Sequence, residues 1–131
     1  MGKPITTKSS GICFAFPNIC LTPVGVAVVP IPYPSIGQLS AVTEQSADVN
    51  AGGNPVVIKP SEMPTTTGDA GGVNGGVTSR TFGKKVEFVS ASTTVFANGE
   101  GIVRLFDSTK QNNGNAVGIV LGGEATVLVG G

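Results

Sequence analysis

Hydrophobic positions are densest between residues 16 and 35, where five prolines interrupt them. Proline fixes φ, lacks a backbone N–H and pushes the preceding residue toward extended geometry. The pattern therefore excludes a helix and disfavours a strand in the middle of a sheet, because a ladder needs its N–H groups. A stiff, extended and apolar ribbon needs burial against the rest of the chain or against a partner. Its prolines are Pro17, Pro23, Pro30, Pro32 and Pro34, and its aliphatic residues include Ile19, Leu21, Val24, Val26, Val28, Val29 and Ile31.

Later in the chain, short valine- and isoleucine-rich stretches flank glycine turns and predict β-hairpins. Residues 47–59 and 93–105 each have the pattern strand, turn, strand, and residues 80–89 predict a further hairpin around Gly83. Gly53-Asn54-Pro55-Val56-Val57 and Gly99-Glu100-Gly101-Ile102-Val103 share the form Gly-x-x-aliphatic-Val at an offset of 46 residues. This similarity indicates a pseudo-repeated β architecture such as a small β-helix or prism. The alternative is that any two glycine hairpins look alike.

The remaining segments are polar or ambiguous. We expect a loose arm over residues 1–11, a short helix or turn over 36–45 and a long polar loop over 61–79. Residues 107–115 read as turn material, and residues 125–129 predict a last strand. The loop's glycine run, 71–76, lacks the Gly-Lys-Ser/Thr ending of a phosphate cradle, so it predicts only tight turns.

Composition narrows the function. The chain has 131 residues, no histidine, 12% charged residues and a formal net charge of zero. An uncharged surface has little electrostatic attraction for nucleic acid and fits a protein that stays docked or assembled. The missing histidine removes the commonest general base and metal ligand. We therefore expect no enzyme and no nucleic-acid partner.

Few side chains are candidates for chemistry. Cys13 and Cys20 are expected to be small buried packing residues. A disulfide between them and a partial metal site are the alternatives, although no Cys-x-x-Cys pair supplies further ligands. Arg104 and Asp107, three residues apart, predict a local ion pair. Neither a secretory signal nor a membrane span is evident, so export is expected by a route that reads no N-terminal signal.

The order of these features resembles the PAAR-like domain family. Pro17-Asn18-Ile19-Cys20-Leu21-Thr22-Pro23 and Val29-Pro30-Ile31-Pro32-Tyr33-Pro34-Ser35-Ile36 are similar to its opening signature. Each later piece is short, and the ordered set over residues 14 to 110 carries the resemblance. The later positions that match are Gly53, Pro55, Thr67, Gly68, Asp69, Gly83, Gly99, Arg104 and Asp107.

The resemblance implies a spike tip. Proteins of this family cap trimeric VgrG-like spikes of type VI secretion and related contractile injection systems, help puncture the target envelope and can carry effectors. It implies an all-β, conical or prism-like β-helical fold with pseudo-threefold hairpins, and one tip per spike trimer. It also implies assembly in the bacterial cytoplasm, then export with the spike and transient contact with the target membrane.

On this basis we expect an N-terminal arm over residues 1–13, the PAAR-like domain over 14–112 and a short extension over 113–131 packed on or near the domain. The proline-rich ribbon should lend aliphatic side chains to the core or base. Founding PAAR proteins hold zinc with histidines and a cysteine, whereas Gln111-Asn112-Asn113 stands where relatives often have histidine. We therefore expect no zinc. The alternatives are a free-standing structural β-domain, such as a tail or decoration protein, and a small toxin or enzyme.

Overall fold

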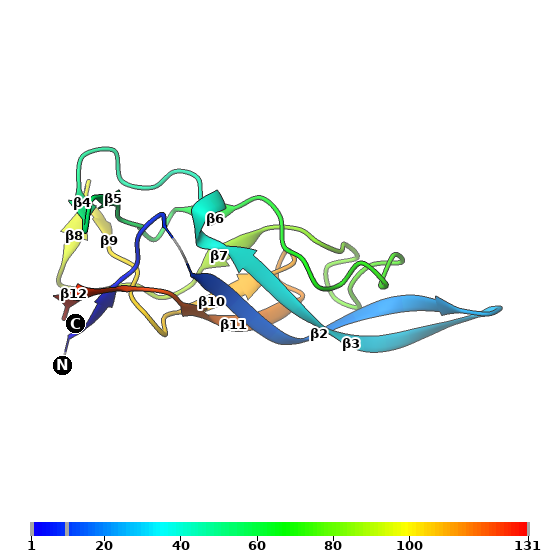
Figure 1. Cartoon of the computed structure of the whole chain (residues 1–131). Coiled ribbons are helices and arrows are strands. Elements are labelled where there is room, and N and C mark those ends of the chain that lie inside the picture. Colours follow the sequence, from blue (N-terminus) through cyan, green and yellow to red (C-terminus); the bar gives the residue numbers. More distant parts are fainter. Residues whose placement is uncertain (1, 10, 131) are drawn as a thin grey trace.

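The computed structural model describes residues 2–9 and 11–130, which form a nearly all-β molecule (Figure 1). This confirms the predicted fold class. Within the described residues, no helix is long and apolar enough to cross a membrane. The elements are β1 Lys3–Ile5, β2 Ile12–Val24, β3 Ala27–Gln38, the 3₁₀ helix η1 Leu39–Ala41, β4 Asn50–Ala51, β5 Asn54–Pro55, β6 Glu62–Met63, β7 Val86–Phe88, β8 Phe96–Ala97, β9 Glu100–Gly101, β10 Ser108–Gln111, β11 Ala116–Leu121 and β12 Glu124–Val129.

The largest sheet is antiparallel and has the strand order β3-β2-β11-β10-β7-β6. Its two longest strands, β2 and β3, form a hairpin that extends well beyond the other strands and gives the molecule a narrow end (Figure 1). The hairpins β4–β5 and β8–β9 and the pair β1–β12 lie at the opposite, broader end, beside both chain ends (Figure 1).

At the broad end, three extended segments close a triangle of backbone hydrogen bonds. Thr6 N donates to Val103 O at 3.0 Å, Val103 N donates to Val57 O at 2.9 Å, and Val57 N donates to Thr6 O at 2.9 Å. We call residues 4–8, 55–59 and 101–105 the three-strand ring. A second cycle lies one step outward and runs in the opposite direction, with Lys8 N donating to Pro55 O, Lys59 N to Gly101 O and Leu105 N to Pro4 O.

Each ring segment is paired with one further strand, and these pairs repeat. Two of them, β4–β5 and β8–β9, are related by the 46-residue offset seen in the sequence, since Asn50 pairs with Pro55 and Phe96 with Gly101. The third pair, β1–β12, joins the two ends of the chain, with Pro4 opposite Leu128. The predicted pseudo-repeat is confirmed, and a third copy, split between the two chain ends, completes it.

Two apolar clusters lie on either side of the ring. Ile5, Val56 and Ile102 occupy equivalent ring positions and point to one side, where they pack with residues of the three strand pairs. Val57 and Val103 point to the other side, into the core beneath the large sheet. The first cluster is completed by Ala51, Ile58, Ala97 and Val129, and the second by Cys13, Leu39, Val42, Met63, Val86, Phe88 and Val120.

The prolines of β3 fit a strand because they occupy its free edge. Ile36 N donates to Thr67 O at 2.9 Å, away from β2, so the even-numbered residues of β3 direct their N–H groups outward. Pro30, Pro32 and Pro34 share this parity and therefore remove no hydrogen bond to β2. β2 lies between two strands only over Ile12–Ala15, before its first proline.

The apolar ribbon was expected to lend its aliphatic side chains to the core or base, but it is only partly buried. Cys20 is buried, but all residues from Pro23 to Pro30 are exposed. The valines of this segment therefore contribute neither to the core nor to the broad end. The hydrophobicity of the ribbon predicted burial correctly only near Cys20. There the loop of residues 74–77 covers β2, and Gly76 pairs with Cys20.

Three other predictions of local structure were wrong. The expected loose arm contains β1 and the ring residue Thr6, both hydrogen-bonded within the molecule. Residues 80–82 form no strand, and β7 pairs with β6 and β10 instead of closing a hairpin around Gly83. The expected turn over residues 107–115 contains the strand β10. The short helix, η1, and the last strand, β12, are confirmed. The domain boundaries stay a prediction.

Shortening a ring side chain should destabilise the whole fold. Val103→Ala removes two fully buried methyl groups next to the central hydrogen bonds, so the free energy of unfolding should fall by about 2–3 kcal/mol. Urea unfolding followed by circular dichroism measures the change. Val117→Ala is the matched control, because Val117 is a strand residue that is 67% exposed, and it should change stability by less than about 0.5 kcal/mol. Equal effects of the two variants would contradict the assigned core.

Candidate docking face

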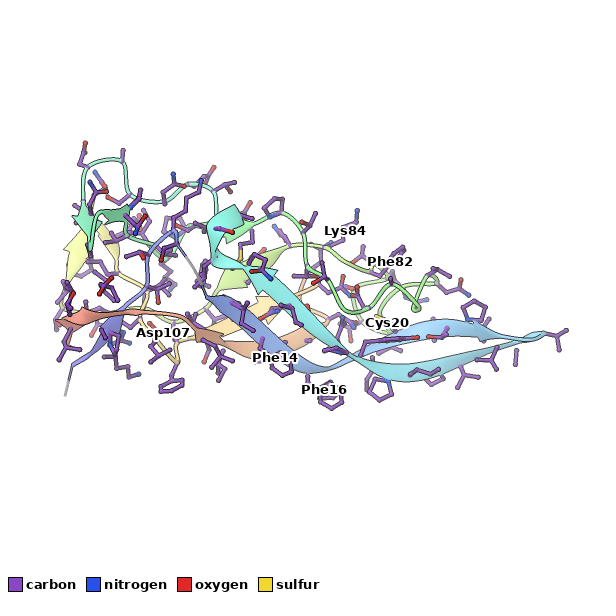
Figure 2. The ribbon with its side chains drawn as sticks, in the orientation of Figure 1. Phe14, Phe16, Cys20, Phe82, Lys84 and Asp107 are labelled. Carbon is purple, nitrogen blue, oxygen red and sulfur yellow. The ribbon has the colours of Figure 1, made fainter. Side chains whose placement is uncertain are left out.

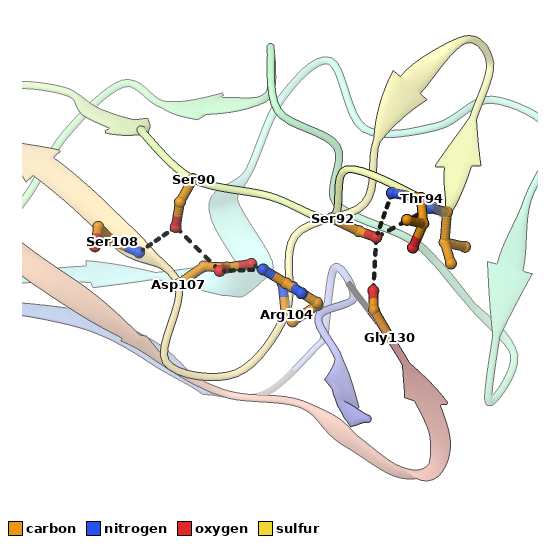
Figure 3. A network of polar contacts seen from close by, with 8 residues as sticks. Ser90, Ser92, Thr94, Arg104, Asp107, Ser108 and Gly130 are labelled. Atoms are coloured by element: carbon orange, nitrogen blue, oxygen red, sulfur yellow. Dashed lines mark hydrogen bonds and ion pairs between the residues drawn. The ribbon is translucent and has the colours of Figure 1, made fainter. Parts of the chain in front are cut away.

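The three strand pairs at the broad end are tied to one another in a cycle. Ser46 Oγ bonds to Asn98 Oδ1, and Ser92 Oγ donates to Gly130 O at 2.7 Å (Figure 3). At the third position the Glu124 carboxylate occupies the space that a Cβ on Gly52 would need, so these two residues lie side by side. These contacts relate equivalent positions of the three copies. The broad end is therefore a pseudo-threefold face, which we call the docking face.

Apolar side chains on this face are exposed at repeated positions. Phe96 in β8 pairs with the ring residue Gly101, and Leu128 in β12 pairs with the equivalent ring residue, Pro4. The two side chains are 57% and 63% exposed. Val49 and Val95, one residue before β4 and β8, are also exposed. The remaining pair, β4–β5, has the polar residue Asn50 at the position of Phe96. The face is thus apolar in part and only approximately symmetric.

A groove of about 540 Å³ runs along the β8–β9 hairpin. Phe96, the turn residue Gly99 and residues 89–93 are among its lining residues. Lys59 and Glu100 are its charged lining residues. One acid and one base among small polar and apolar residues suit a contact surface better than acid–base chemistry, which needs groups held within hydrogen-bond reach of a substrate.

A buried ion pair anchors the third ring segment (Figure 3). Arg104 Nε and Nη2 donate to Asp107 Oδ2 and Oδ1 at 3.0 and 2.9 Å, and Arg104 N donates to Oδ2 at 2.7 Å. Ser90 Oγ donates to Asp107 Oδ1 at 3.0 Å. The predicted local ion pair is therefore confirmed. At the equivalent place in the ring segment 55–59, Ile58 N donates to Ser61 Oγ. Both segments thus have a backbone N–H bonded to the side chain three residues later, a carboxylate in one and a hydroxyl in the other.

A second polar cluster is buried where the hairpin leaves the body of the molecule. Asn18 Nδ2 donates to Asp69 Oδ2 at 2.7 Å, and Gly83 N donates to the same oxygen at 3.0 Å. Asn112 Nδ2 and Asn115 Nδ2 donate to Asn18 Oδ1 at 3.2 and 2.6 Å. Four segments that are distant in sequence thus meet at Asn18.

Cys20 lies beside this cluster, under the loop that carries Phe82 and Lys84 (Figure 2). Its thiol is fully buried, 3.6 Å from Asn18 Oδ1 and 3.8 Å from Asn112 Nδ2. Burial, and secondarily the negative charge of Asp69, raises the pKa of the Cys20 thiol. Burial also raises the pKa of Cys13 to about 12. Both cysteines are free, which argues against the disulfide alternative.

The residues around Cys20 do not fit the zinc site that the PAAR resemblance implies. Structural zinc needs four ligands, chiefly thiolates and imidazoles. Cys20 is surrounded by the amides of Asn18 and Asn112, and the nearby Asp69 oxygen already accepts two hydrogen bonds. Within residues 2–9 and 11–130, no group of three or more His, Cys, Asp or Glu side chains could hold a metal ion.

The other positions of the sequence signature are spread over the whole molecule, so they do not form one site. The structure explains why position 68 is glycine. Its φ is +109°, and a Cβ there would lie 2.6 Å from Pro34 O. Pro17, Thr22 and Pro23 lie in β2; Pro30, Pro32, Tyr33 and Pro34 in β3; Gly53 and Pro55 at β4–β5; Thr67 in the loop before β7; and Gly99 in the β8–β9 turn.

Sequence reasoning missed the buried amides. Gln111 and Asn112 were noted only as replacements for histidine, yet both are fully buried. Gln111 Nε2 donates to Ser35 O at 2.9 Å and Thr109 Oγ1 donates to Gln111 Oε1 at 2.9 Å. The available signal was the polar spacing of residues 109 and 111, which is the period of a strand with one buried face.

A family model described as "Toxin PAAR-like domain" matches residues 11–118. No curated protein and no solved structure matches the chain.

Removing the charge of Asp107 should be costly. Asp107→Asn leaves the buried Arg104 guanidinium without its counter-charge, so stability should fall by about 3–5 kcal/mol. Chemical denaturation measures the loss. Glu87→Gln is the control, because it breaks only the exposed Lys85–Glu87 pair and should leave the unfolding midpoint nearly unchanged. A stable Asp107→Asn protein would refute the anchoring role.

Both thiols should be inert in the folded protein. Their raised pKa values keep them protonated, so a thiol reagent at pH 8 should label neither cysteine until the chain is unfolded. Because the unfolded thiols ionise near pH 9.0 and the folded ones at higher pH, stability should fall as pH rises above about 9. Elemental analysis of the same sample should find no stoichiometric zinc. Rapid labelling of native protein, or one zinc per chain, would contradict this account.

Proposed function

The chain belongs to the Toxin PAAR-like domain family, and from that premise we propose that it is the tip of a trimeric, VgrG-like spike in a contractile injection system. Its role in this proposal is structural, without catalysis. It caps the blunt end of the spike, sharpens it and helps puncture the target envelope. Type VI secretion is the setting that the family suggests, and effectors are proposed as cargo.

The pseudo-threefold docking face is the observation that carries the proposal. A trimer offers three equivalent contact positions around its axis, and one chain can meet all three only if it repeats a contact unit three times. The three strand pairs around the ring supply that repeat. This supports a stoichiometry of one tip per trimer.

The surface of the docking face also suits the end of a β-helical spike. The end of such a spike exposes unpaired strand N–H and C=O groups. The turn glycines Gly53 and Gly99 have open space around them, so their backbone is accessible to a partner. Phe96 and Leu128 offer apolar area beside these turns. Together they allow backbone hydrogen bonds and hydrophobic burial at one interface.

The narrow end would point away from the spike. In Figure 1 the β2–β3 hairpin extends from the side of the molecule opposite β4–β5, β8–β9 and the chain ends. A tip docked through its broad end therefore leads with this hairpin. We propose assembly in the bacterial cytoplasm, followed by export with the spike and delivery to the outside or to a target cell.

Binding to a spike tests the proposal directly. The purified chain, mixed with trimeric spike proteins encoded beside contractile sheath genes in the same genome, should bind as one chain per trimer in light scattering. Phe96→Asp combined with Leu128→Asp should raise Kd at least tenfold, because burying each of these side chains is worth about 1.5–3 kcal/mol. Val117→Asp adds a charge to an exposed strand position away from the docking face and should bind normally.

Two results would refute the spike-tip proposal. One is assembly of the chain alone into a closed oligomer that no spike dissociates, which would favour a decoration protein. The other is a spike complex that the paired docking-face substitutions leave unchanged.

A further inference from the structure

The end of the β2–β3 hairpin is apolar without interruption and exposed to solvent. Every residue from Pro23 to Pro30 is exposed, and Val26 at the turn has no shielding at all. A tight turn of this kind is possible because Gly25 takes a positive φ of 60°. No charged residue occurs between Lys8 and Glu44 in the sequence. We call residues 23–30 the hairpin end.

Prolines have removed backbone donors from one edge of the hairpin. The outward-facing N–H positions of β3 are the even-numbered ones, as the bond from Ile36 N to Thr67 O shows. Pro30, Pro32 and Pro34 occupy three of these positions, and Val28 is the one residue from 28 to 34 of that parity that keeps its donor. This edge therefore offers almost no N–H groups to an incoming strand.

The other edge follows the same rule. On β2 beyond its register shift, from Asn18 onward, the odd-numbered residues direct their N–H groups outward, since Leu21 N donates to Gly75 O at 2.7 Å. Pro23 occupies the next outward position. The loop of residues 74–77 covers the edge up to Leu21, and proline removes the donor beyond it. Neither edge of the hairpin end is thus suited to β-strand addition, which depends on main-chain hydrogen bonds.

These features match a lipid environment. In hydrocarbon an unpaired backbone polar group costs several kcal/mol and a charged side chain costs more, so a segment without charges and with few free N–H groups is suited to enter it. Four residues from Pro23 to the turn span roughly 13 Å, less than one leaflet of a bilayer core that is about 30 Å thick. The outward carbonyl oxygens remain, and they favour a shallow position where water can still reach them.

We propose that the hairpin end, residues 23–30, inserts into the outer part of a lipid bilayer. The proposal rests on the proposed function, because a spike tip is the part of an injection machine that meets the target envelope first. The Thr22 and Tyr33 hydroxyls, 2.7 Å apart, mark the polar limit of the inserted segment. Tyrosine is a residue that favours the boundary between lipid and water.

Two other occupants fit the hairpin end less well. The spike would contact the docking face, which lies at the opposite end of the molecule (Figure 1). A second copy of the chain would pair most readily through strand edges, and prolines block these edges.

A tryptophan probe tests insertion. The chain contains no tryptophan, so Val26→Trp in the full-length protein gives a single reporter. With phosphatidylcholine vesicles its emission should shift to the blue, and lipids brominated near the headgroup should quench it more than lipids brominated near the acyl-chain end. Adding phosphatidylglycerol or salt should change binding little, because the hairpin end is uncharged.

Matched variants assign the binding to the hairpin end. Val26→Asp with Val28→Asp should lower the vesicle partition coefficient at least about 30-fold, since each buried carboxylate opposes insertion strongly. Val73→Asp with Val117→Asp adds the same charge at exposed valines elsewhere and should leave partitioning unchanged. All four sites are exposed, so both proteins should retain the unfolding midpoint of the parent.

The outcomes separate this proposal from the spike-tip proposal. Insertion is supported if the parent binds vesicles and Val26→Asp with Val28→Asp abolishes this binding while the control variant keeps it. This holds whether or not the chain binds a spike. Absence of vesicle binding, or an unshifted Val26→Trp emission, overturns insertion even if the spike complex forms. A self-associated parent that Val26→Asp with Val28→Asp converts to monomer also overturns it, because a second copy would then cover the hairpin end.

Discussion

The three-strand ring is the constraint on which the rest of the molecule depends. Its central bonds join Thr6, Val57 and Val103, and each segment donates one bond and accepts one. No pair of segments can close this cycle, so removing one leaves a buried donor and a buried acceptor unpaired. Long-range closure of this kind has a high entropic cost before any contact is made. The two apolar clusters on either side of the ring offset that cost only when all three segments are in place.

Ring closure also explains the layout of the chain. The third strand pair joins β1 to β12, so both chain ends are held at the broad end and the large sheet lies between them in sequence. The stretch from β2 to β11, which includes the other two strand pairs, is therefore constrained at both ends by the β1–β12 pair. The long β2–β3 hairpin can then extend freely, because it carries none of the ring's hydrogen bonds.

The sequence predicted the ring in part. Two copies were visible because Gly53–Val57 and Gly99–Val103 repeat a turn and a strand within one continuous stretch. The third copy was invisible, since its strands lie at opposite ends of the chain and carry no glycine turn between them. β10 was missed for a different reason: its inward residues, Thr109 and Gln111, are polar and satisfy one another instead of packing as apolar side chains.

The valine-rich ribbon shows the limit of reasoning from hydrophobicity. Apolar content indicates that a segment favours burial, but it does not identify the burying surface. Where β2 runs under the loop of residues 74–77, the chain itself provides that surface for Cys20. From Pro23 to Pro30 the hairpin is exposed, and prolines replace most of the outward donors on its two edges. The same proline spacing that first argued against a central strand therefore defines an edge that resists other strands and leaves its side chains to meet a surface that does not hydrogen-bond.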